Sequence, residues 1–145
     1  YYKKGVDQLA AEGWSIVYGD AQAISLDRKF DVVTAGDLIE HLANLDGFFT
    51  CVKNHLHLNG KFVISTPNPW CWKYFLYHLF MGRLARINKE HVSWFCLETL
   101  CLLGNRYGFK HVKHGYCSRR LYENLVPLPR HIKHTTLIIE FELVS

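Results

Sequence analysis

Residues 30–66 read FDVVTAGDLIEHLANLDGFFTCVKNHLHLNGKFVIST and predict a strand, a helix and a second strand. The first strand comes from residues 30–35, a nearly continuous apolar stretch typical of a strand buried on both faces. Residues 44–58 then carry apolar side chains at helical spacing, and Asn44 or Asp46 can cap this helix. The apolar stripe comprises Leu45, Phe48, Phe49, Val52 and Leu56. Asn59 and Gly60 break the helix, and the second strand begins within residues 61–66.

The segments on either side of this unit extend the same pattern. Val6, Leu9 and Ala10 recur at helical spacing, Gly13 ends that helix, and residues 15–20, SIVYGD, predict another strand. Further along, residues 97–107 predict a helix, residues 110–117 a strand and residues 135–144 the last strand. Strands that alternate with helices, joined by connections long enough for parallel pairing, predict an open α/β sheet. No internal repeat or linker divides the chain, so residues 1–145 are expected to form a single domain.

The composition agrees with one globular domain. Of 145 residues, 49% are hydrophobic and 21% are charged, which excludes a disordered chain, a collagen-like repeat and a disulfide-stapled mini-protein. The 17 Lys and Arg against 13 Asp and Glu give a net charge of +4. Because the basic residues are scattered and form no compact stripe, nucleic acid is not an expected partner.

The cysteines and the first residues of the chain give information about where in the cell the protein is found. Five cysteines without a CxxC pair indicate reduced thiols, as in a cytoplasmic protein. No apolar run approaches the ~18 residues of a membrane span, and the first residues lack the apolar core of a signal peptide. The chain begins without methionine, so we expect it to be a fragment of a longer protein.

Polar residues follow three of the predicted strands at the point where each strand ends. They are Gly19-Asp20-Ala21, the segment Gly36 to His41, and Thr66-Pro67-Asn68-Pro69. Ligands of open α/β sheets bind beyond the carboxyl ends of the strands, so these residues could converge on one crevice. Each group taken alone is also an ordinary turn.

Taken in order, four sequence elements resemble those of the class I S-adenosylmethionine-dependent methyltransferases. They are GDA at 19–21, FDVVTAGDLIEHL at 30–42, LHLNGKFVISTPNP at 56–69 and HVSWFCLETLCLLGNRYGF at 91–109. The resemblance covers nearly the whole chain and implies a Rossmann-like, mostly parallel sheet with an antiparallel last strand. The positions that match the family's usual pattern are Asp31, Asp37, Glu40, His41, Gly60, Thr66, Pro67 and Asn68, whereas Asn59 stands where the family usually has glycine.

The resemblance also implies a truncated domain. The family's GxGxG loop after the first strand, and the acidic residue that ends the second strand, do not occur in these 145 residues. By the family's topology, residues 2–13 would form the helix after the second strand. We therefore expect the chain to hold only the adenine side of the S-adenosylmethionine site and to bind this cofactor poorly by itself.

The resemblance assigns cofactor-binding roles to the first two strand ends. Gly19, Asp20 and Ala21 would hold the adenine, with the Asp20 carboxylate accepting a hydrogen bond from its amino group. Asp37 and Leu38 would line the methionine portion.

His41 and Glu40 are the catalytic candidates. His41 would take a proton from an acceptor hydroxyl, because imidazole titrates near neutral pH; the plain alternative is a histidine packed at the start of a helix. Some relatives, including ubiquinone-type O-methyltransferases and small-RNA 2′-O-methyltransferases, bind a divalent ion through an acidic-x-x-Glu-His set. That resemblance implies Asp37, Glu40, His41 and His91 as a second candidate set, with Asp37 shorter than the usual Glu.

An aromatic insertion at about residues 67–90 is the main clue to the substrate. We expect it to cover the acceptor side of the crevice as a lid, or else to be a helical insertion that packs on the sheet. The candidate lid residues are Trp70, Trp72, Tyr74, Phe75 and His91. With Lys73, Arg83 and Arg86 nearby, the segment could also rest on a membrane surface.

These observations favour S-adenosylmethionine-dependent methylation of an oxygen atom on a small or lipid-linked acceptor. One alternative is a catalytically inactive methyltransferase-like fold that serves as a binding module. The other is a nicotinamide-dependent oxidoreductase, which the DLIEHL element and the last strand fit less well.

Overall fold

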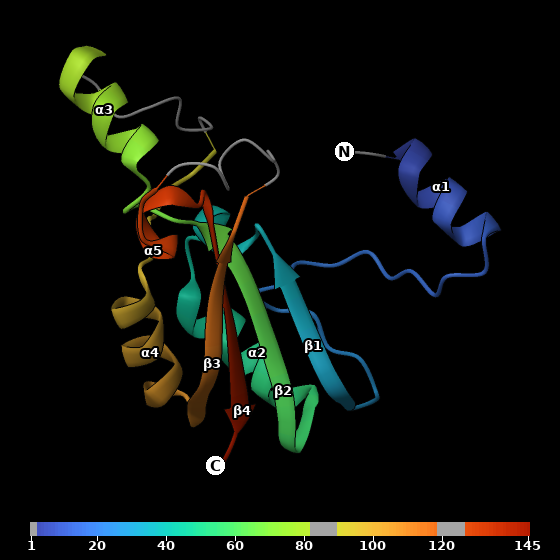
Figure 1. Cartoon of the computed structure of the whole chain (residues 1–145). Helices are drawn as coiled ribbons and strands as arrows, with labels where there is room; N and C mark the ends of the chain where they lie inside the picture. The colour runs from blue at the N-terminus through green and yellow to red at the C-terminus, as the bar shows by residue number, and fades with distance from the viewer. Residues whose placement is uncertain (1–2, 82–89, 119–126) are drawn as a thin grey trace.

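Four strands form one sheet in this computed structural model, which describes residues 3–81, 90–118 and 127–145. They are β1 (Phe30–Gly36), β2 (Leu56–Pro67), β3 (Phe109–Cys117) and β4 (Thr136–Leu143), in the spatial order β1-β2-β4-β3 (Figure 1). β1 and β2 are parallel, whereas β4 is antiparallel to both β2 and β3. Only the last strand is reversed, so the predicted Rossmann-like sheet with an antiparallel last strand is confirmed.

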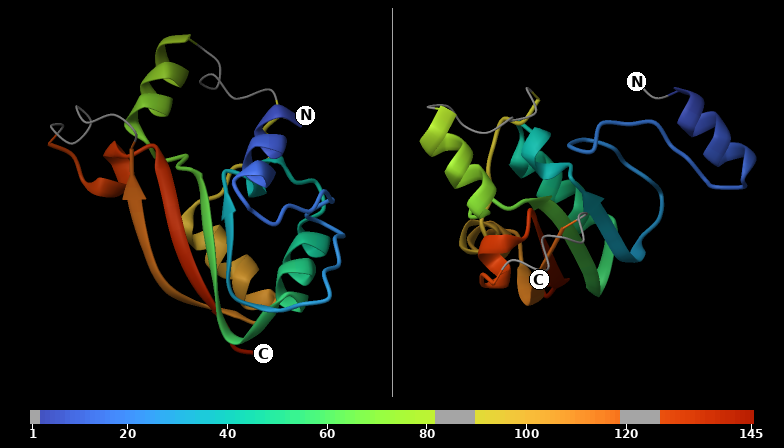
Figure 2. Two further views of the ribbon diagram at one scale, coloured as in Figure 1. Left: turned by 90° about the vertical axis from the view of Figure 1, so that its right-hand side faces the viewer. Right: turned by 45° about the horizontal axis from the view of Figure 1, so that its top comes forward.

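Two helices cover one face of this sheet. α2 (Leu45–Asn54) connects β1 to β2, and α4 (Leu97–Arg106) leads into β3. Asn44 caps α2 as predicted, because its side-chain oxygen accepts a hydrogen bond from the Gly47 amide at 2.9 Å. Three further helices lie at the end of the sheet where β1 and β2 terminate (Figures 1 and 2). They are η1 (Ile39–His41) after β1, α3 (Trp72–Met81) after β2 and α5 (Arg130–Lys133) before β4.

The core between the helices and the sheet is largely aromatic. Phe49 of α2 stacks on Tyr107 at 4.9 Å between ring centroids and meets Phe62 of β2 edge-on at 6.0 Å. Gly104 lets α4 approach β4 closely, because a Cβ at this position would lie 2.7 Å from the Phe141 ring. The helices are therefore fixed to the sheet by ring packing and by one close contact.

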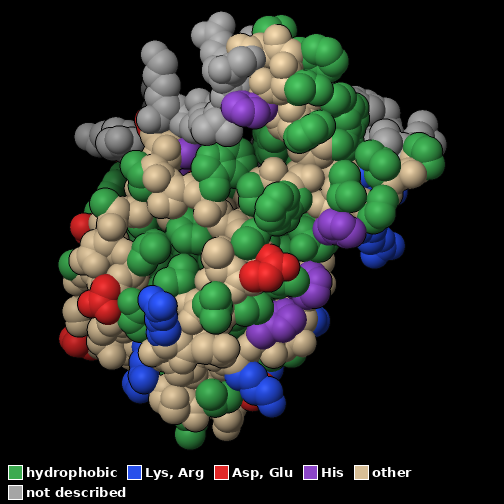
Figure 3. Space-filling model, turned by 90° about the vertical axis from the view of Figure 1, so that its left-hand side faces the viewer, with side chains coloured by type: hydrophobic (Ala, Val, Ile, Leu, Met, Phe, Trp, Pro, Cys, Tyr) green, Lys and Arg blue, Asp and Glu red, His purple; other side chains and the backbone are tan. Residues whose placement is uncertain are grey.

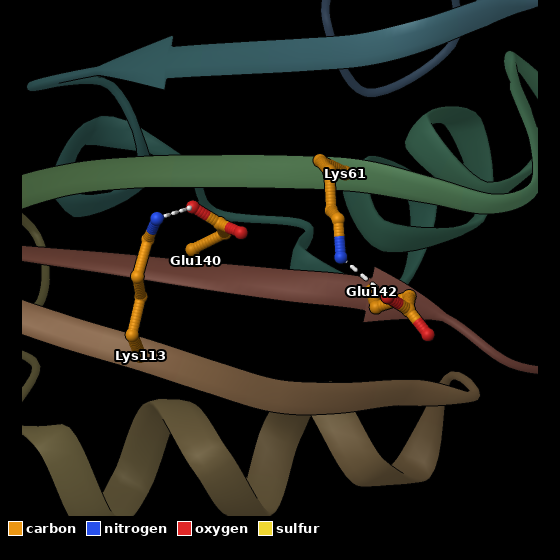
Figure 4. A network of polar contacts seen from close by, with 4 residues as sticks. All are labelled: Lys61, Lys113, Glu140 and Glu142. Atoms are coloured by element: carbon orange, nitrogen blue, oxygen red, sulfur yellow. Dashed lines mark hydrogen bonds and ion pairs between the residues drawn. The ribbon is translucent and has the colours of Figure 1, made fainter.

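The other face of the sheet carries ion pairs. Lys61 of β2 pairs with Glu142 of β4, and Lys113 of β3 pairs with Glu140 at 3.1 Å (Figure 4). The hydrogen bond and charge of Lys61 hold the pKa of Glu142 below its ordinary value of 4.5. Val32 lies 53% exposed, so the prediction that β1 is buried on both faces is wrong: helices cover only one face of the described sheet.

Two further expectations need correction. The strand predicted at residues 15–20 does not form, because β1 is the edge of the described sheet and no described strand lies beside these residues. Residues 55–58 are not helical either: α2 ends at Asn54, and β2 begins at Leu56, whose side chain is buried. Asn59 takes a left-handed φ of 65° within β2, near an irregularity of pairing with β1, so residues 59–60 deform a strand instead of ending a helix.

Two helices stand away from this core. α1 (Lys3–Ala11) is joined to β1 by residues 12–29 and lies apart from the sheet in Figure 1 and in the right-hand view of Figure 2. No residue of α3 is fully buried. No helix within the described ranges is long and apolar enough to cross a membrane.

Candidate active site

The turn between β1 and η1 is strained. Asp37, directly after β1, has a left-handed φ of 46°, which a residue other than glycine adopts at a cost. Ser65 of β2 holds it there: its carbonyl accepts from the Asp37 amide at 2.9 Å, and its hydroxyl donates to the Asp37 carboxylate at 3.2 Å. The turn directs the chain into η1, whose Ile39 side chain is fully buried.

Glu40 is a buried carboxylate with one oxygen unpaired. Its side chain is only 1% exposed, and Oε2 accepts a hydrogen bond from the Thr66 hydroxyl at 3.0 Å. Oε1 is also buried and has no hydrogen-bond partner in the described part of the chain. A buried, unpaired carboxylate oxygen is costly, and a hydrogen-bond donor or a cation at Oε1 would offset that cost.

His41 presents one specific ring nitrogen. Its Nδ1 lies 3.1 Å from the backbone carbonyl oxygen of Glu90. Because a carbonyl can only accept, Nδ1 is the donor, and Nε2 is the nitrogen that carries the lone pair in the neutral ring. His91 meets the His41 ring edge-on at 4.6 Å between centroids. The amides of Val92 and Ser93 donate to the Glu40 carbonyl at 2.9 and 3.2 Å, which ties the segment after residue 90 to η1.

Three of the four predicted metal ligands come together. One ligand atom each from Glu40, His41 and His91 lie within 4.8 Å of one another. Carboxylate and imidazole suit a divalent transition metal, and a backbone carbonyl on the other nitrogen of His41 is how a ligating histidine is usually oriented. Asp37 is not part of this group, because its carboxylate is turned to Ser65. These residues fit a divalent ion.

The predicted adenine loop is an ordered turn near the start of α2. Oδ1 of Asp20 accepts from the Gln22 amide at 2.9 Å and from its side-chain nitrogen at 3.0 Å, and these bonds lower the Asp20 pKa. Gln22 in turn accepts from the Asn44 amide at 2.7 Å. Gly19 and Ala21 flank this residue in the chain.

A cavity of about 820 Å³ is lined in part by residues 69–78, at the start of the predicted aromatic insertion. Trp70, Trp72, Tyr74 and Phe75 line one wall, so the structure brings four of the five candidate lid residues together. The fifth, His91, does not line the cavity and contacts His41 instead. On this face hydrophobic and histidine side chains gather below α3, with an acidic group among them (Figure 3).

Sequence reasoning missed several residues of this region. Trp94 lies between the cavity and the histidines, with its ring 5.3 Å from Tyr74 and 6.4 Å from His91. The carbonyl of Glu90 orients His41, although no sequence pattern marks a backbone atom for that role. The opposite cavity wall, from α4, β3 and α5, could be found only from the fold.

The comparisons with known proteins agree with the fold. The family model for a methyltransferase domain matches residues 6–114. No curated protein matches the sequence.

Among solved structures, an S-adenosylmethionine-dependent methyltransferase from Archaeoglobus fulgidus is 18% identical, with a TM-score of 0.68 over 97% of this chain and 72% of the other. One from Clostridium acetobutylicum is 12% identical, with a TM-score of 0.65 over 97% of this chain and 70% of the other. The N-methyltransferase NodS from Bradyrhizobium japonicum is 13% identical, with a TM-score of 0.60 over 97% and 67%. These likenesses show a shared fold, and the match over residues 6–114 shows that the chain belongs to the methyltransferase domain family.

Proposed function

We propose that this domain transfers the methyl group of S-adenosylmethionine to an oxygen atom of a small or lipid-linked acceptor. The observation that carries the proposal is the contact of His41 Nδ1 with the Glu90 carbonyl, which makes Nε2 the proton acceptor of the neutral ring, next to the buried Glu40 carboxylate. Support for the methyl donor comes from the family match and from the shared fold.

Residues at the two strand ends would hold the donor. Asp20, with Gly19 and Ala21, is suited to the adenine, and Asp37 and Leu38 to the methionine portion. S-adenosylmethionine, when bound, supplies a methyl group on a positively charged sulfur. The protein's part is to align the acceptor oxygen with that carbon and to exclude water.

His41 accounts for the choice of oxygen. An alcohol or phenol is a poor nucleophile until it loses its proton, and Nε2 of His41 can take that proton as the new carbon–oxygen bond forms. The Glu40 carboxylate, within 4.8 Å of the imidazole, would stabilise the resulting positive charge. A neutral amine needs no such base before it attacks, so this geometry favours oxygen even though NodS is an N-methyltransferase.

A divalent ion is the second way in which this site could activate an oxygen. The unpaired Oε1 of Glu40 favours it, and Glu40, His41 and His91 would hold the ion. Such an ion would lower the pKa of an acceptor hydroxyl and orient its oxygen. In that case His41 would act as a ligand and not as a base.

The test uses the complete gene product, a radiolabelled methyl donor, and paired phenols and anilines that share one carbon skeleton. We expect label on the phenols, a loss of at least about 100-fold in His41→Ala, and an unchanged rate in His57→Ala, an exposed histidine of β2. If a chelator abolished the activity and Mn²⁺ restored it, the acceptor oxygen would be activated by a divalent ion and not by His41 acting as a base. The assignment to oxygen would be overturned if only the anilines were labelled, or if His41→Ala left the rate unaltered. If no compound were labelled, the alternative of a catalytically inactive binding module would be favoured.

A further inference from the structure

The cavity below α3 is built from four separate elements. Besides the aromatic wall from residues 69–78, it is lined by residues of α4, β3 and α5. This second wall comprises Leu97, Glu98, His114, Tyr116, His131 and Ile132. Aromatic and aliphatic side chains therefore dominate both sides, as in pockets that bind ligands by apolar contact.

Asn68 holds the two walls together. It is 1% exposed, and its side-chain nitrogen donates to the carbonyls of His131 and His134 at 2.7 and 2.8 Å. Its Oδ1 accepts from the Trp70 amide at 3.2 Å, so one buried side chain fixes α5 against the start of the aromatic wall. The cavity is thus supported by buried hydrogen bonds, which distinguishes it from a chance gap between surface side chains.

The cavity is coupled to the candidate active site in two ways. Thr66, which donates to Glu40, lies three residues before Pro69, the first residue of the cavity wall. The rings of Tyr74, Trp94, His91 and His41 also form a continuous row from the wall to the proposed base. The cavity wall is therefore connected to the proposed base through Trp94 and His91, although neither Glu40, His41 nor His91 lines the cavity.

The charges of the lining select among ligands. Glu98 is the sole acidic side chain among the described lining residues, three histidines (His78, His114 and His131) also line the cavity, and no described lysine or arginine does. Hydrogen bonds from its own backbone amide and from Cys96 lower the Glu98 pKa, so this group is ionised. Trp72 keeps a buried indole N–H without an acceptor among the described residues. An anionic ligand would meet Glu98, whereas a neutral hydroxyl can donate to it and can accept from an N–H.

From these features we infer that the cavity binds the methyl acceptor, and that the acceptor is a neutral hydroxyl compound with a large apolar body. This inference rests on the proposed function, because it names the substrate class of the same site. The alternative is that this region binds a bilayer surface, because the tip of α3 is exposed. The bilayer would be contacted by Leu79, Phe80 and Met81, which do not line the cavity.

The test measures binding of 4-alkylphenols, from butyl to octyl, by equilibrium dialysis without any methyl donor. We expect the affinity to rise by up to about fourfold per added methylene. We also expect 4-octylbenzoate to bind at least about tenfold more weakly than 4-octylphenol. Equal affinity across the alkyl series, or tighter binding of the benzoate, would overturn the inference.

Two residues of α3 provide a matched pair of variants. Phe75 and Phe80 are 67% and 75% exposed, so either can be changed to serine without opening the core, but only Phe75 lines the cavity. We expect Phe75→Ser to weaken 4-octylphenol binding at least about tenfold and Phe80→Ser to leave it within about twofold. An equal loss of 4-octylphenol binding in both variants would assign the surface to lipid. The same conclusion would follow if Phe80→Ser lost binding to phosphatidylcholine vesicles while Phe75→Ser had no effect on phenol binding. Because no donor is present, failure here is distinct from failure of the His41 test.

Discussion

The Thr66 hydroxyl donates a hydrogen bond of 3.0 Å to Oε2 of Glu40, and this bond joins the end of β2 to the short helix after β1. Both residues are 1% exposed, so the pair is shielded from water. The bond holds the carboxylate in place, and one of its oxygens lies within 4.8 Å of a ring nitrogen of each of the two histidines. A structural contact between strand ends thereby sets the geometry of the candidate site.

Replacing Thr66 with valine tests this relationship. The change keeps the shape but leaves both oxygens of a buried carboxylate unpaired, so we expect a loss of about 1–3 kcal/mol in the free energy of unfolding. Urea denaturation measures it, with Thr34→Val on the exposed face of β1 as the control. Equal stability of the two variants would show that the bond contributes nothing.

Ligand binding by the three-residue group can be followed without any reaction. Titration with Co²⁺ should give a visible absorption band, which His91→Ala should weaken at least about tenfold and Asp37→Ala should leave unchanged. The pair separates the observed set of Glu40, His41 and His91 from the four-residue set that the sequence predicts. A band that depends on Asp37, or no band at all, would contradict it.

Close packing of α4 on β4 makes Gly104 sensitive to substitution. A Cβ here would lie 2.7 Å from Phe141, so we expect Gly104→Ala to destabilise the fold by about 1–3 kcal/mol. Gly115 of β3 has nothing within 4 Å of the same position, and Gly115→Ala should be neutral or slightly stabilising. Thermal unfolding of the two variants compares them directly; equal melting temperatures would show that the helix shifts without cost.

The ion pair between Lys61 and Glu142 predicts a specific pH dependence. Because the Glu142 pKa is lowered in the folded state, its stabilising effect is complete above the ordinary value of 4.5 and is lost as the pH falls below it. The stability difference between the wild-type protein and Glu142→Gln should therefore be present at pH 7 and should shrink as the pH falls below 4.5. A difference that stays constant over this range would remove the carboxylate's charge as its cause.

Local patterns in the sequence predict most of the fold. The apolar stripe of α2 from Leu45 to Val52, its Asn44 cap and the strands on either side of it are local features, and these are observed. Residues 15–20 fail as a strand because pairing requires a neighbouring strand, which local composition does not supply. The Asn59-Gly60 pair predicts the end of a helix, but Asn59 lies inside β2 with a left-handed φ. The same residue pair is typical of both situations, so the sequence does not distinguish them.

The candidate site was less predictable than the fold. The resemblance implies Glu40, His41 and His91, but it does not show how His91 reaches His41. That contact depends on the hydrogen bonds from the amides of Val92 and Ser93 to the Glu40 carbonyl. Asp37 is not part of the observed ligand group, because its carboxylate accepts a hydrogen bond from Ser65. These two residues are 28 positions apart in the sequence, so no local pattern predicts the contact. The far wall of the cavity comes from β3 and α5, which no motif connects to the aromatic segment.

Asp20 offers the most direct test of the central claim, that this domain uses S-adenosylmethionine. Calorimetry on the complete gene product should show binding of S-adenosylmethionine that Asp20→Ala weakens roughly tenfold or more. The exposed Asp27→Ala is the matched control and should bind like the wild-type protein. Absence of binding to the wild-type protein, or an Asp20→Ala variant with unchanged affinity, would contradict the account.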